Sequence, residues 1–348
     1  MRKILYVASS YNHIKSFNLP YIEELRKNNE VEVMSNTNEG EIKVNFVKKY
    51  LSFTNFINLF KIRKIINKNK YDCIILNTSL ASFLVRLSLK GKKNRPLVIN
   101  IVHGYLFSSL HGFKNKILFS MEKIVKNQTD YILTMNDFDY EIAKENSLAK
   151  RGIYKIRGMG VKRSNTFENP SPYEQNRYNI LYAAELSNRK NQLFILNHLK
   201  RIIEIIPNVK VNFIGQGSNY RKYVKFVQDN NLHDYVKFWG FVNEPANFFK
   251  HCDLYVSSSE IEGLPFNILN AVEYDKNIIC SNIKGHKDID EIDNYLYLYN
   301  DENEFLNLIK TIYRSKKTKK GEKTFLHFEF NNVFNENITL IQSLINRN

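Results

Sequence analysis

Cysteine, proline, glycine and tryptophan are all scarce in this chain of 348 residues, which holds 3, 7, 13 and 1 of them. The cysteines, Cys73, Cys252 and Cys280, are widely spaced and lie in or beside apolar runs, which argues against a disulfide framework and favours a reducing compartment. Few glycines and prolines leave little room for low-complexity linkers. No window reaches the roughly 18 apolar residues of a spanning helix, so we expect no integral membrane protein.

Acidic residues are scarce in the N-terminal half only. Residues 1–162 hold 28 Lys and Arg against 13 Asp and Glu, a net charge of +15, whereas residues 163–348 hold 23 against 22. This asymmetry indicates an anionic partner for the N-terminal half, either nucleic acid or an anionic membrane surface. A basic solvated surface without a partner is the alternative.

Two basic amphipathic segments, 53–70 and 105–126, favour the membrane. In the first, large apolar side chains recur at helical spacing and lysines recur on another face. The apolar positions are Phe53, Phe56, Ile57, Phe60 and Ile65, and the lysines are Lys61, Lys64 and Lys68. The alternative is that each apolar stripe packs on a sheet.

Short apolar runs alternate with helical patterns along the whole chain, which predicts parallel sheets with crossover helices. The opening MRKILYVASS has an apolar run of only Ile4–Ala8, so we expect a first strand there and no signal peptide. The expected strands are 3–8, 31–35, 44–48, 73–77, 97–103, 131–135, 154–157, 179–183, 209–214, 236–240, 254–257 and 277–281.

The expected fold class is therefore α/β, with two Rossmann-like, doubly wound domains. Residues 1–162 form the first domain, and the unpatterned, proline-containing segment 163–178 is an interdomain linker. Residues 179–330 form the second domain, and the helical segment 331–348 is expected to pack back toward the first. Two such domains would face each other across a cleft at the carboxyl ends of their strands.

The most informative stretch is SSSEIEGLPFNILNAVEYD, in which a strand ends in serines and a helix follows. Gly263 allows close backbone approach to a ligand, and the helix start offers free N–H groups for a phosphate. Glu262 precedes Asn270 by eight residues, and Asn267 shares a face with Asn270. This pattern predicts a nucleotide-sugar site, with a capped helix and a polar outer face as the alternative.

Two upstream loops complete this expected site. Arg189 and Lys190 follow a strand and suit a diphosphate, although adjacent basic residues usually lie in solvent. The Gly-x-Gly turn at 215–217 lacks the third glycine of a dinucleotide-binding fingerprint. Backbone groups beside a base are expected from Gly240, Phe241 and Val242.

In the N-terminal half, His103 ends an apolar strand, which favours an acid/base or substrate-positioning role over a buried structural histidine. Asp137 and Asp139, like Asp288 and Asp290, mimic a metal-binding Asp-x-Asp pattern. Helix capping explains Asp137, so we expect no metal.

Taken together, the motifs NIVHGYLF, DYILTMNDFDYEIAK, LSNRKNQ and EIEGLPFNILNAVE resemble those of family 4 glycosyltransferases with the GT-B fold. The resemblance covers nearly the whole chain and is strongest to bacterial enzymes of capsule, O-antigen and exopolysaccharide synthesis. The last motif corresponds to the E-x7-E signature of retaining enzymes. On the donor side, the resemblance implies that Lys190, with Arg189, binds the diphosphate and that Glu262 contacts the sugar. It implies main-chain contacts to the donor from Gly263 and Leu264. It also implies that His103 lies at the reaction centre and that Asn12 and His13 lie in a loop on the acceptor side.

Three positions depart from the family pattern. Asn270 replaces the second signature glutamate, which normally contacts the ribose, so weaker binding or another donor preference is expected. Glu185 stands where many relatives have an arginine, and Asn77 replaces a common histidine. A reduced activity is the alternative that these departures leave open.

We therefore expect a retaining, metal-independent hexosyltransferase that needs no cofactor besides its nucleotide-sugar co-substrate, a UDP-sugar foremost. The expected acceptor is an undecaprenyl-diphosphate-linked saccharide, reached by a cytoplasmic protein held peripherally on the inner face of the bacterial membrane. A nucleotide-sugar epimerase on the same fold is the first alternative. The second is a nucleic-acid-binding protein, but no stacking platform or recognition helix supports it, so we expect no nucleic acid.

Overall fold

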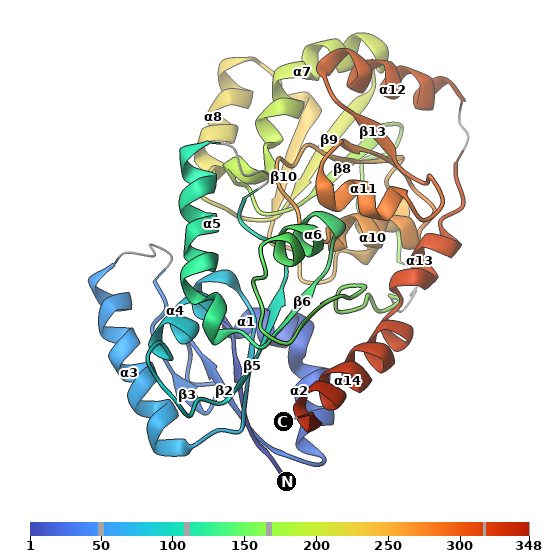
Figure 1. The fold of residues 1–348 in the computed structure, drawn as a ribbon. Helices are drawn as coiled ribbons and strands as arrows, with labels where there is room; N and C mark the ends of the chain where they lie inside the picture. Colours follow the sequence, from blue (N-terminus) through green and yellow to red (C-terminus); the bar gives the residue numbers. More distant parts are fainter. Residues whose placement is uncertain (48–51, 108–111, 165–168, 316–317, 348) are drawn as a thin grey trace. The chain divides into compact units, whose positions relative to one another are not determined.

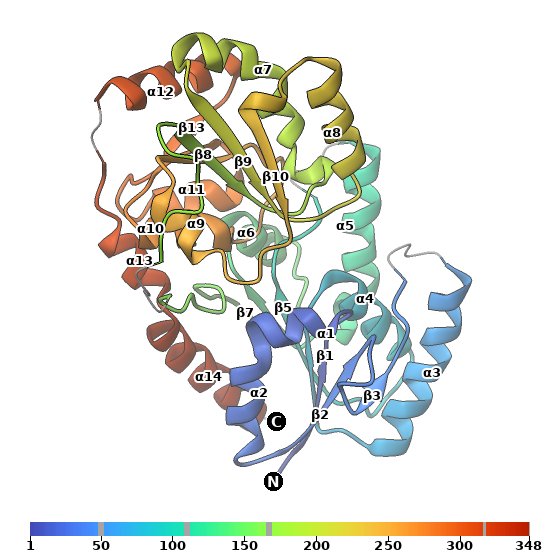
Figure 2. The same cartoon turned by 180° about the vertical axis from the view of Figure 1, so that it is seen from behind.

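The computed structural model describes residues 1–47, 52–107, 112–164, 169–315 and 318–347. The chain forms two compact units, each built on a parallel sheet (Figures 1 and 2). Unit 1 contains Met1–Gly160 and Asn331–Asn348, and unit 2 contains Val161–Phe330. The described part of the expected linker lies in unit 2, where the Tyr173 hydroxyl donates to the Phe248 carbonyl at 2.8 Å.

The sheet of unit 1 has the strand order β3-β2-β1-β4-β5-β6-β7. The strands are β1 (Lys3–Val7), β2 (Glu30–Ser35), β3 (Ile42–Lys43), β4 (Cys73–Leu76), β5 (Leu97–Val102), β6 (Tyr131–Thr134) and β7 (Gly152–Lys155). The helices are α1 (Tyr11–His13), the π-helical η1 (Ile14–Asn18), α2 (Leu19–Arg26), α3 (Phe53–Asn69), α4 (Ser79–Ser88), α5 (Phe113–Val125), the 3-10 turn η2 (Lys126–Gln128), α6 (Asp137–Glu145) and α14 (Phe330–Asn346).

Continuous burial explains why β4, β5 and β6 form the centre of this sheet. Every residue of CIIL, LVINIV and YILT is buried, as expected for parallel strands covered on both faces. The strand order changes direction between β1 and β4, so the loops after these strands diverge at their carboxyl ends. Such a switch point is where open parallel sheets bind ligands.

Unit 2 has the strand order β10-β9-β8-β11-β12-β13, with its switch point between β8 and β11. The strands are β8 (Tyr178–Ala183), β9 (Val209–Ile214), β10 (Val236–Gly240), β11 (Leu254–Ser257), β12 (Asn277–Ser281) and β13 (Tyr297–Tyr299). The helical elements are η3 (Asn188–Lys190), α7 (Gln192–Ile205), α8 (Tyr220–Asp229), η4 (His233–Tyr235), α9 (Ala246–His251), α10 (Phe266–Glu273), α11 (Lys284–Asp290), α12 (Glu302–Ser315) and α13 (Glu322–Phe328).

One expected strand, 44–48, differs from the structure. Pairing with β2 involves only Ile42 and Lys43, because the chain turns after Val44, whose carbonyl accepts from the Phe46 amide at 2.9 Å. Residue 48 lies outside the described residues. The short β13 was not expected, since three residues are too few to show a strand period.

Helix α14 packs on unit 1. The Phe334 ring lies 4.8 Å from that of Tyr21, and the Asn337 amide donates to the Gly158 carbonyl at 2.7 Å and to the Tyr21 hydroxyl at 3.2 Å. The expected C-terminal segment 331–348 therefore completes the unit with which the chain begins. Within the described residues, no helix is both long and apolar enough to span a bilayer.

Candidate active site

Glu262, Lys190 and Arg189 form an ion cluster at the carboxyl edge of the unit 2 sheet. Lys190 and Arg189 follow β8 and Glu262 follows β11, and these two strands are neighbours across the switch point. The Lys190 ammonium donates to one carboxylate oxygen of Glu262, and the Arg189 guanidinium donates to the other at 3.2 Å. The Arg189 guanidinium also donates to the carbonyl of Ile261 at 3.0 Å.

Buried hydroxyls hold the two loops of this ion cluster together. The Tyr182 hydroxyl, from inside β8, donates to the Lys190 carbonyl and accepts from the Ser258 amide at 3.1 Å. The Ser258 hydroxyl donates to the Asn191 carbonyl at 2.7 Å, and the Glu260 amide donates to the Arg189 carbonyl at 2.9 Å. The cations are therefore fixed by backbone as well as by charge.

Burial and charge oppose each other at Glu262. Only 6% of this residue is exposed, and burial by itself would raise the pKa of its carboxyl. The positive charges of Lys190 and Arg189 outweigh burial and hold that pKa below its usual value. Burial lowers the pKa of Lys190, and the carboxylate of Glu262 opposes this effect. Two cations therefore lie around the Glu262 carboxylate, an arrangement that suits an anionic ligand.

Gly285 and His286, two residues that sequence reasoning missed, lie against this ion cluster. A Cβ on Gly285 would overlap the Gly263 carbonyl oxygen and lie 3.1 Å from the Cβ of Glu262. His286 is fully buried, its Nδ1 lies 2.6 Å from the Ser281 carbonyl oxygen, and burial lowers its pKa to about 4. Its Nε2 is buried without a hydrogen-bond partner among the described residues.

The two asparagines expected to share a face of α10, Asn267 and Asn270, have different surroundings in the structure. Asn267 donates its amide to the Ala183 carbonyl and so fastens α10 to the end of β8. Asn270 lines a pocket of about 300 Å³ with Glu244, Phe249 and Tyr274, among others, and Glu262 does not line that pocket. The structure therefore does not show Glu262 and Asn270 in one common hollow. Leu264 is buried, and Gly263 contacts α11 as described above.

The turn at 240–242 lies at the end of β10. Gly240 has a φ of 71°, and its carbonyl accepts from the Gly215 amide at 2.8 Å. Phe241 is 69% exposed, and Val242 is half-buried. The Gly-x-Gly turn has a structural reason, because a Cβ on Gly215 would overlap the Ala184 carbonyl.

Unit 1 has its own cluster of polar side chains at the carboxyl ends of its strands. The Nε2 of His103 lies 3.1 Å from the Asn77 amide oxygen and 3.3 Å from the Nε2 of His13. The Asn18 amide donates to the same Asn77 oxygen at 3.2 Å and to the Tyr6 hydroxyl at 3.0 Å. Tyr6 and Asn18, both fully buried, were not found from the sequence because Tyr6 lies inside an apolar run.

Both histidines of this cluster are neutral at ordinary pH. Burial lowers the pKa of His13 to about 4. Burial and the nearby His13 lower the pKa of His103 well below its usual value. A neutral His103 that donates its Nε2 proton to Asn77 presents Nδ1 as an acceptor. Asn12 lies beside His13 on α1 and is exposed.

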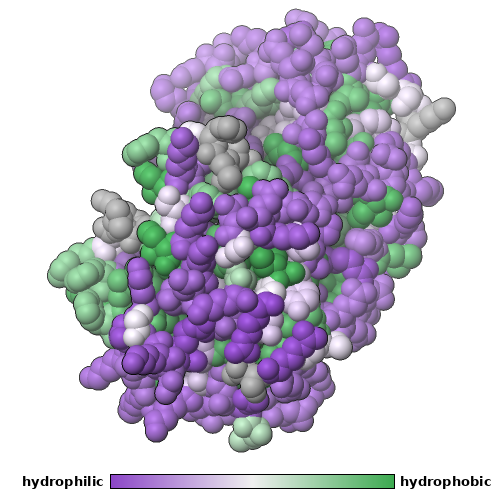
Figure 3. Space-filling model, in the orientation of Figure 1, coloured by the Kyte–Doolittle hydropathy of each residue, from purple (hydrophilic) through white to green (hydrophobic). Residues whose placement is uncertain are grey.

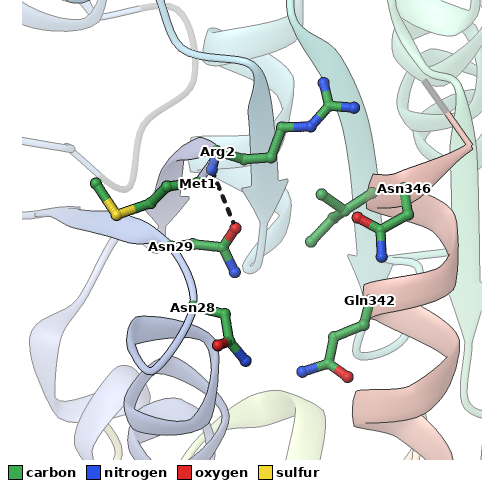
Figure 4. Close-up of a pocket in the computed structure, with 7 residues that line it drawn as sticks. Met1, Arg2, Asn28, Asn29, Gln342 and Asn346 are labelled. Carbon is green, nitrogen blue, oxygen red and sulfur yellow. Dashed lines mark hydrogen bonds between the residues drawn. The ribbon is translucent and has the colours of Figure 1, made fainter.

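No group of three or more His, Cys, Asp or Glu side chains in the described residues is placed to hold a metal ion. Asp137 pairs with Lys155 at 2.6 Å, and Asp139 accepts from the Tyr105 amide at 3.0 Å. The polar hollow in Figure 4, about 380 Å³, lies beside the amino end of β1 and is lined by Arg2, Asn29 and Gln342, among others. It belongs to the edge of the sheet opposite the histidines.

Comparison with known proteins finds a similarity to one family model within unit 2. Residues 164–323 match the family model described as "Glycosyl transferases group 1". The protein named "Putative glycosyltransferase EpsD" of Bacillus subtilis is 28% identical over 94% of this chain and 93% of its own. The capsular polysaccharide biosynthesis glycosyltransferase CapH of Staphylococcus aureus is 25% identical, over 83% of this chain and 80% of its own.

A third relative, from Escherichia coli, is named UDP-Gal:alpha-D-GlcNAc-diphosphoundecaprenol alpha-1,3-galactosyltransferase. It is 26% identical over 72% of this chain and 69% of its own. Among solved structures, Anabaena HepE with UDP and glucose superposes with a TM-score of 0.72 at 17% identity, covering 99% of this chain and 100% of its own. The apo lipopolysaccharide outer core galactosyltransferase WaaB gives 0.66 at 16%, over 98% and 99%. These structures share the two-unit fold.

Proposed function

We propose that the chain is a glycosyltransferase with a group 1 domain on the GT-B fold, and that it serves the synthesis of a bacterial surface polysaccharide. In this proposal it moves a hexose from a nucleotide-sugar onto a lipid-linked saccharide. The observation that carries the proposal is the ion cluster of Lys190, Arg189 and Glu262 at the switch point of unit 2. The names of the relatives support the polysaccharide context.

The donor enters by exchanging partners within the ion cluster. Its diphosphate takes over Lys190 and Arg189, which now neutralise Glu262. The released carboxylate then accepts hydrogen bonds from hydroxyls of the donor sugar. UDP is the proposed nucleotide, because the Anabaena structure holds UDP and the name of the E. coli relative contains UDP-Gal.

The proposed transfer retains the anomeric configuration. The acceptor hydroxyl attacks the anomeric carbon from the face that the diphosphate leaves. The bond between that carbon and the phosphate oxygen breaks with its electron pair on the diphosphate, which takes up the hydroxyl proton. Lys190 and Arg189 stabilise the charge that develops on the leaving group, so we propose that no divalent metal is needed.

Unit 1 takes the acceptor in this proposal. The neutral His103 offers its Nδ1 to a sugar hydroxyl at the reaction centre, and His13 and Asn12 line the acceptor side. An undecaprenyl-diphosphate carrier fits the net charge of +15 on residues 1–162 and the name of the E. coli relative. Such an acceptor would keep the protein at the inner face of the membrane.

The experiment is UDP-sugar turnover and UDP binding by the purified protein and two variants. Lys190→Ala is expected to lower UDP affinity at least tenfold, since it removes the cation nearest the carboxylate. Lys200→Ala, an exposed lysine on α7, is the matched control and should bind as the wild type does. Wild-type UDP affinity in the Lys190→Ala variant would contradict the donor site.

The two alternatives gain no support. An epimerase would convert a free nucleotide-sugar without an acceptor, and the named relatives reported above are glycosyltransferases. Nucleic-acid binding rested on charge alone.

A further inference from the structure

The first half of helix α3 of unit 1 buries polar side chains and exposes apolar ones. Its buried positions there are amides: the Asn55 side chain exchanges two hydrogen bonds with the backbone of Val47 at 2.8 and 3.1 Å, and the Asn58 side chain donates to the Asn45 carbonyl at 2.8 Å. Its outward positions are apolar. The exposed fractions are 78% for Phe53, 56% for Phe56, 50% for Ile57 and 62% for Phe60. Burying amides while exposing three phenylalanines costs free energy unless an apolar phase covers the rings.

The second half of α3 turns the same side of the helix basic. Lys61 follows Ile57 by four residues, and Lys64 and Lys68 follow Phe60 by four and eight, so all three continue the outward side, and all three are exposed. Segment 53–70 contains no Asp or Glu. Meanwhile Ile62 and Ile66 take over the buried face and anchor the helix in the core of unit 1. The outward side therefore runs from aromatic to cationic along the helix axis.

Helix α5 repeats the pattern close by. Phe113, Ile117 and Ile124 lie four and seven residues apart on one exposed side, and Lys116 and Lys123 flank it. The helix between them, α4, packs against both α3 and α5. Figure 3 shows apolar side chains gathered over the start of α3 and the start of α5. Of the twelve large apolar side chains that are exposed in the described residues, seven lie on these two helices.

We propose that the outward sides of α3 and α5 form a docking surface for an anionic phospholipid bilayer, with Phe53, Phe56, Ile57 and Phe60 entering the acyl boundary. Charge selects this occupant, because the lysines next to the rings meet anionic headgroups and no exposed carboxylate of α3 or α5 repels them. This deepens the proposed function, on which it rests for its purpose: a protein docked here would meet lipid-linked acceptors in the plane of the bilayer.

The test is sedimentation with vesicles that contain no acceptor lipid, either phosphatidylcholine alone or phosphatidylcholine with 30% phosphatidylglycerol, roughly the charge of an anionic leaflet. Wild-type protein should bind the anionic vesicles more tightly, and binding should weaken as salt rises. The double variant F56S/F60S should bind them at least tenfold more weakly, about what losing two partly inserted rings implies. Tyr220→Ser, an exposed aromatic on α8 of unit 2, should bind as the wild type does.

Charge is tested separately. K64E/K68E should lose anionic-vesicle binding at least tenfold, whereas Lys222→Glu, an exposed lysine on α8, should lose little. Undiminished vesicle binding by F56S/F60S overturns the proposal. So does a wild-type dimer in solution that F56S/F60S dissociates, because a second copy of the chain would then cover the rings.

The same samples separate the two proposals. F56S/F60S should keep the thermal stabilisation that UDP gives the wild type, because its substitutions lie in unit 1 and on the surface. If UDP stabilises neither protein while anionic vesicles still bind the wild type and not the variant, the donor proposal fails and the docking surface stands. If UDP stabilises both and vesicles bind both equally, the docking surface fails alone.

Discussion

At the scale of single residues, Glu262 carries two duties that a substitution can separate. It neutralises Lys190 and Arg189 before the donor arrives, and in the proposed mechanism it then contacts the donor sugar. Glu262→Gln should therefore leave UDP affinity unchanged or raise it several-fold, since both cations become available. Turnover of the UDP-sugar should fall about 100-fold, as for the loss of one charged contact in the transition state. Calorimetric titration with UDP and a turnover assay measure the two effects. A parallel fall in both would contradict the division of duties.

His286 gives unit 2 a pH-dependent stability. Burial holds its pKa at about 4, below the ordinary 6.5 that the unfolded chain has. Between these two pKa values, His286 is protonated in the unfolded chain and neutral in the folded protein. The folded protein therefore loses stability as pH falls from about 6.5 toward 4. One such histidine costs about 2 kcal/mol at pH 5 relative to pH 7. Urea unfolding at the two pH values should show a smaller pH difference for His286→Asn. An equal difference would exclude His286 as the cause.

The sequence predicts a site residue well when that residue directly follows a strand and belongs to a distinctive motif. Lys190 and Glu262 were expected in one site, and the structure brings them into contact. Gly285 and His286 could not be predicted, because their closeness to Glu262 arises from how α11 packs and no spacing signals it. Asn270 lines a pocket with Glu244 and Tyr274, and its expected contact with the donor stays a prediction, since helix periodicity gives a shared face and not the depth of a pocket.

At the scale of elements, the close approach of α11 to the Glu262–Gly263 turn positions the candidate site. Gly285→Ala should push the two segments apart and cost about 1–3 kcal/mol of stability, the usual range for overpacking. UDP-sugar turnover should fall further than that loss explains, because the carboxylate moves with its turn. Gly152→Ala is the control, since the atoms nearest to its Cβ would be those of the Tyr154 side chain and not of backbone. Equal stability losses in the two variants would argue against a special fit at Gly285.

Strands that are buried along their whole length could be predicted from the sequence, and strands that pair with a neighbour over only two or three residues were missed. Strands such as β4 and β9 are buried at every position, so their apolar runs stand out in the sequence. The strands β3 and β13 have only two and three residues. They form because a neighbouring strand pairs with them, and their own sequence shows no strand pattern. The outward aromatic side of α3 was visible as a stripe, but the polar side chains that the helix buries, Asn55 and Asn58, look solvent-facing in the sequence.

At the scale of the whole molecule, unit 1 is built from both ends of the described chain. Asn337 links them, since its amide bonds the Tyr21 hydroxyl and the Gly158 carbonyl. Asn337→Ala removes the side-chain donor to the Gly158 carbonyl and one of the hydrogen bonds of the Tyr21 hydroxyl, which should cost about 1–3 kcal/mol. Hydrogen exchange should show the loss in β1 and β4 and not in β8 and β11. Thr339→Ala, which removes an exposed hydroxyl two residues further along α14, should have little effect. Equal deprotection of both sheets would contradict the assignment of α14 to unit 1.

The return of α14 to unit 1 has a consequence for how the protein is made. Translation delivers residues 161–330 before residues 331–348, so unit 2 is complete in sequence while unit 1 still lacks its last helix. During that interval the Tyr21 ring, which Phe334 later covers, has no partner from α14. A nascent chain therefore carries an unfinished apolar surface on unit 1 until α14 has been made. A stop codon placed between unit 2 and α14 would leave that surface of unit 1 permanently uncovered.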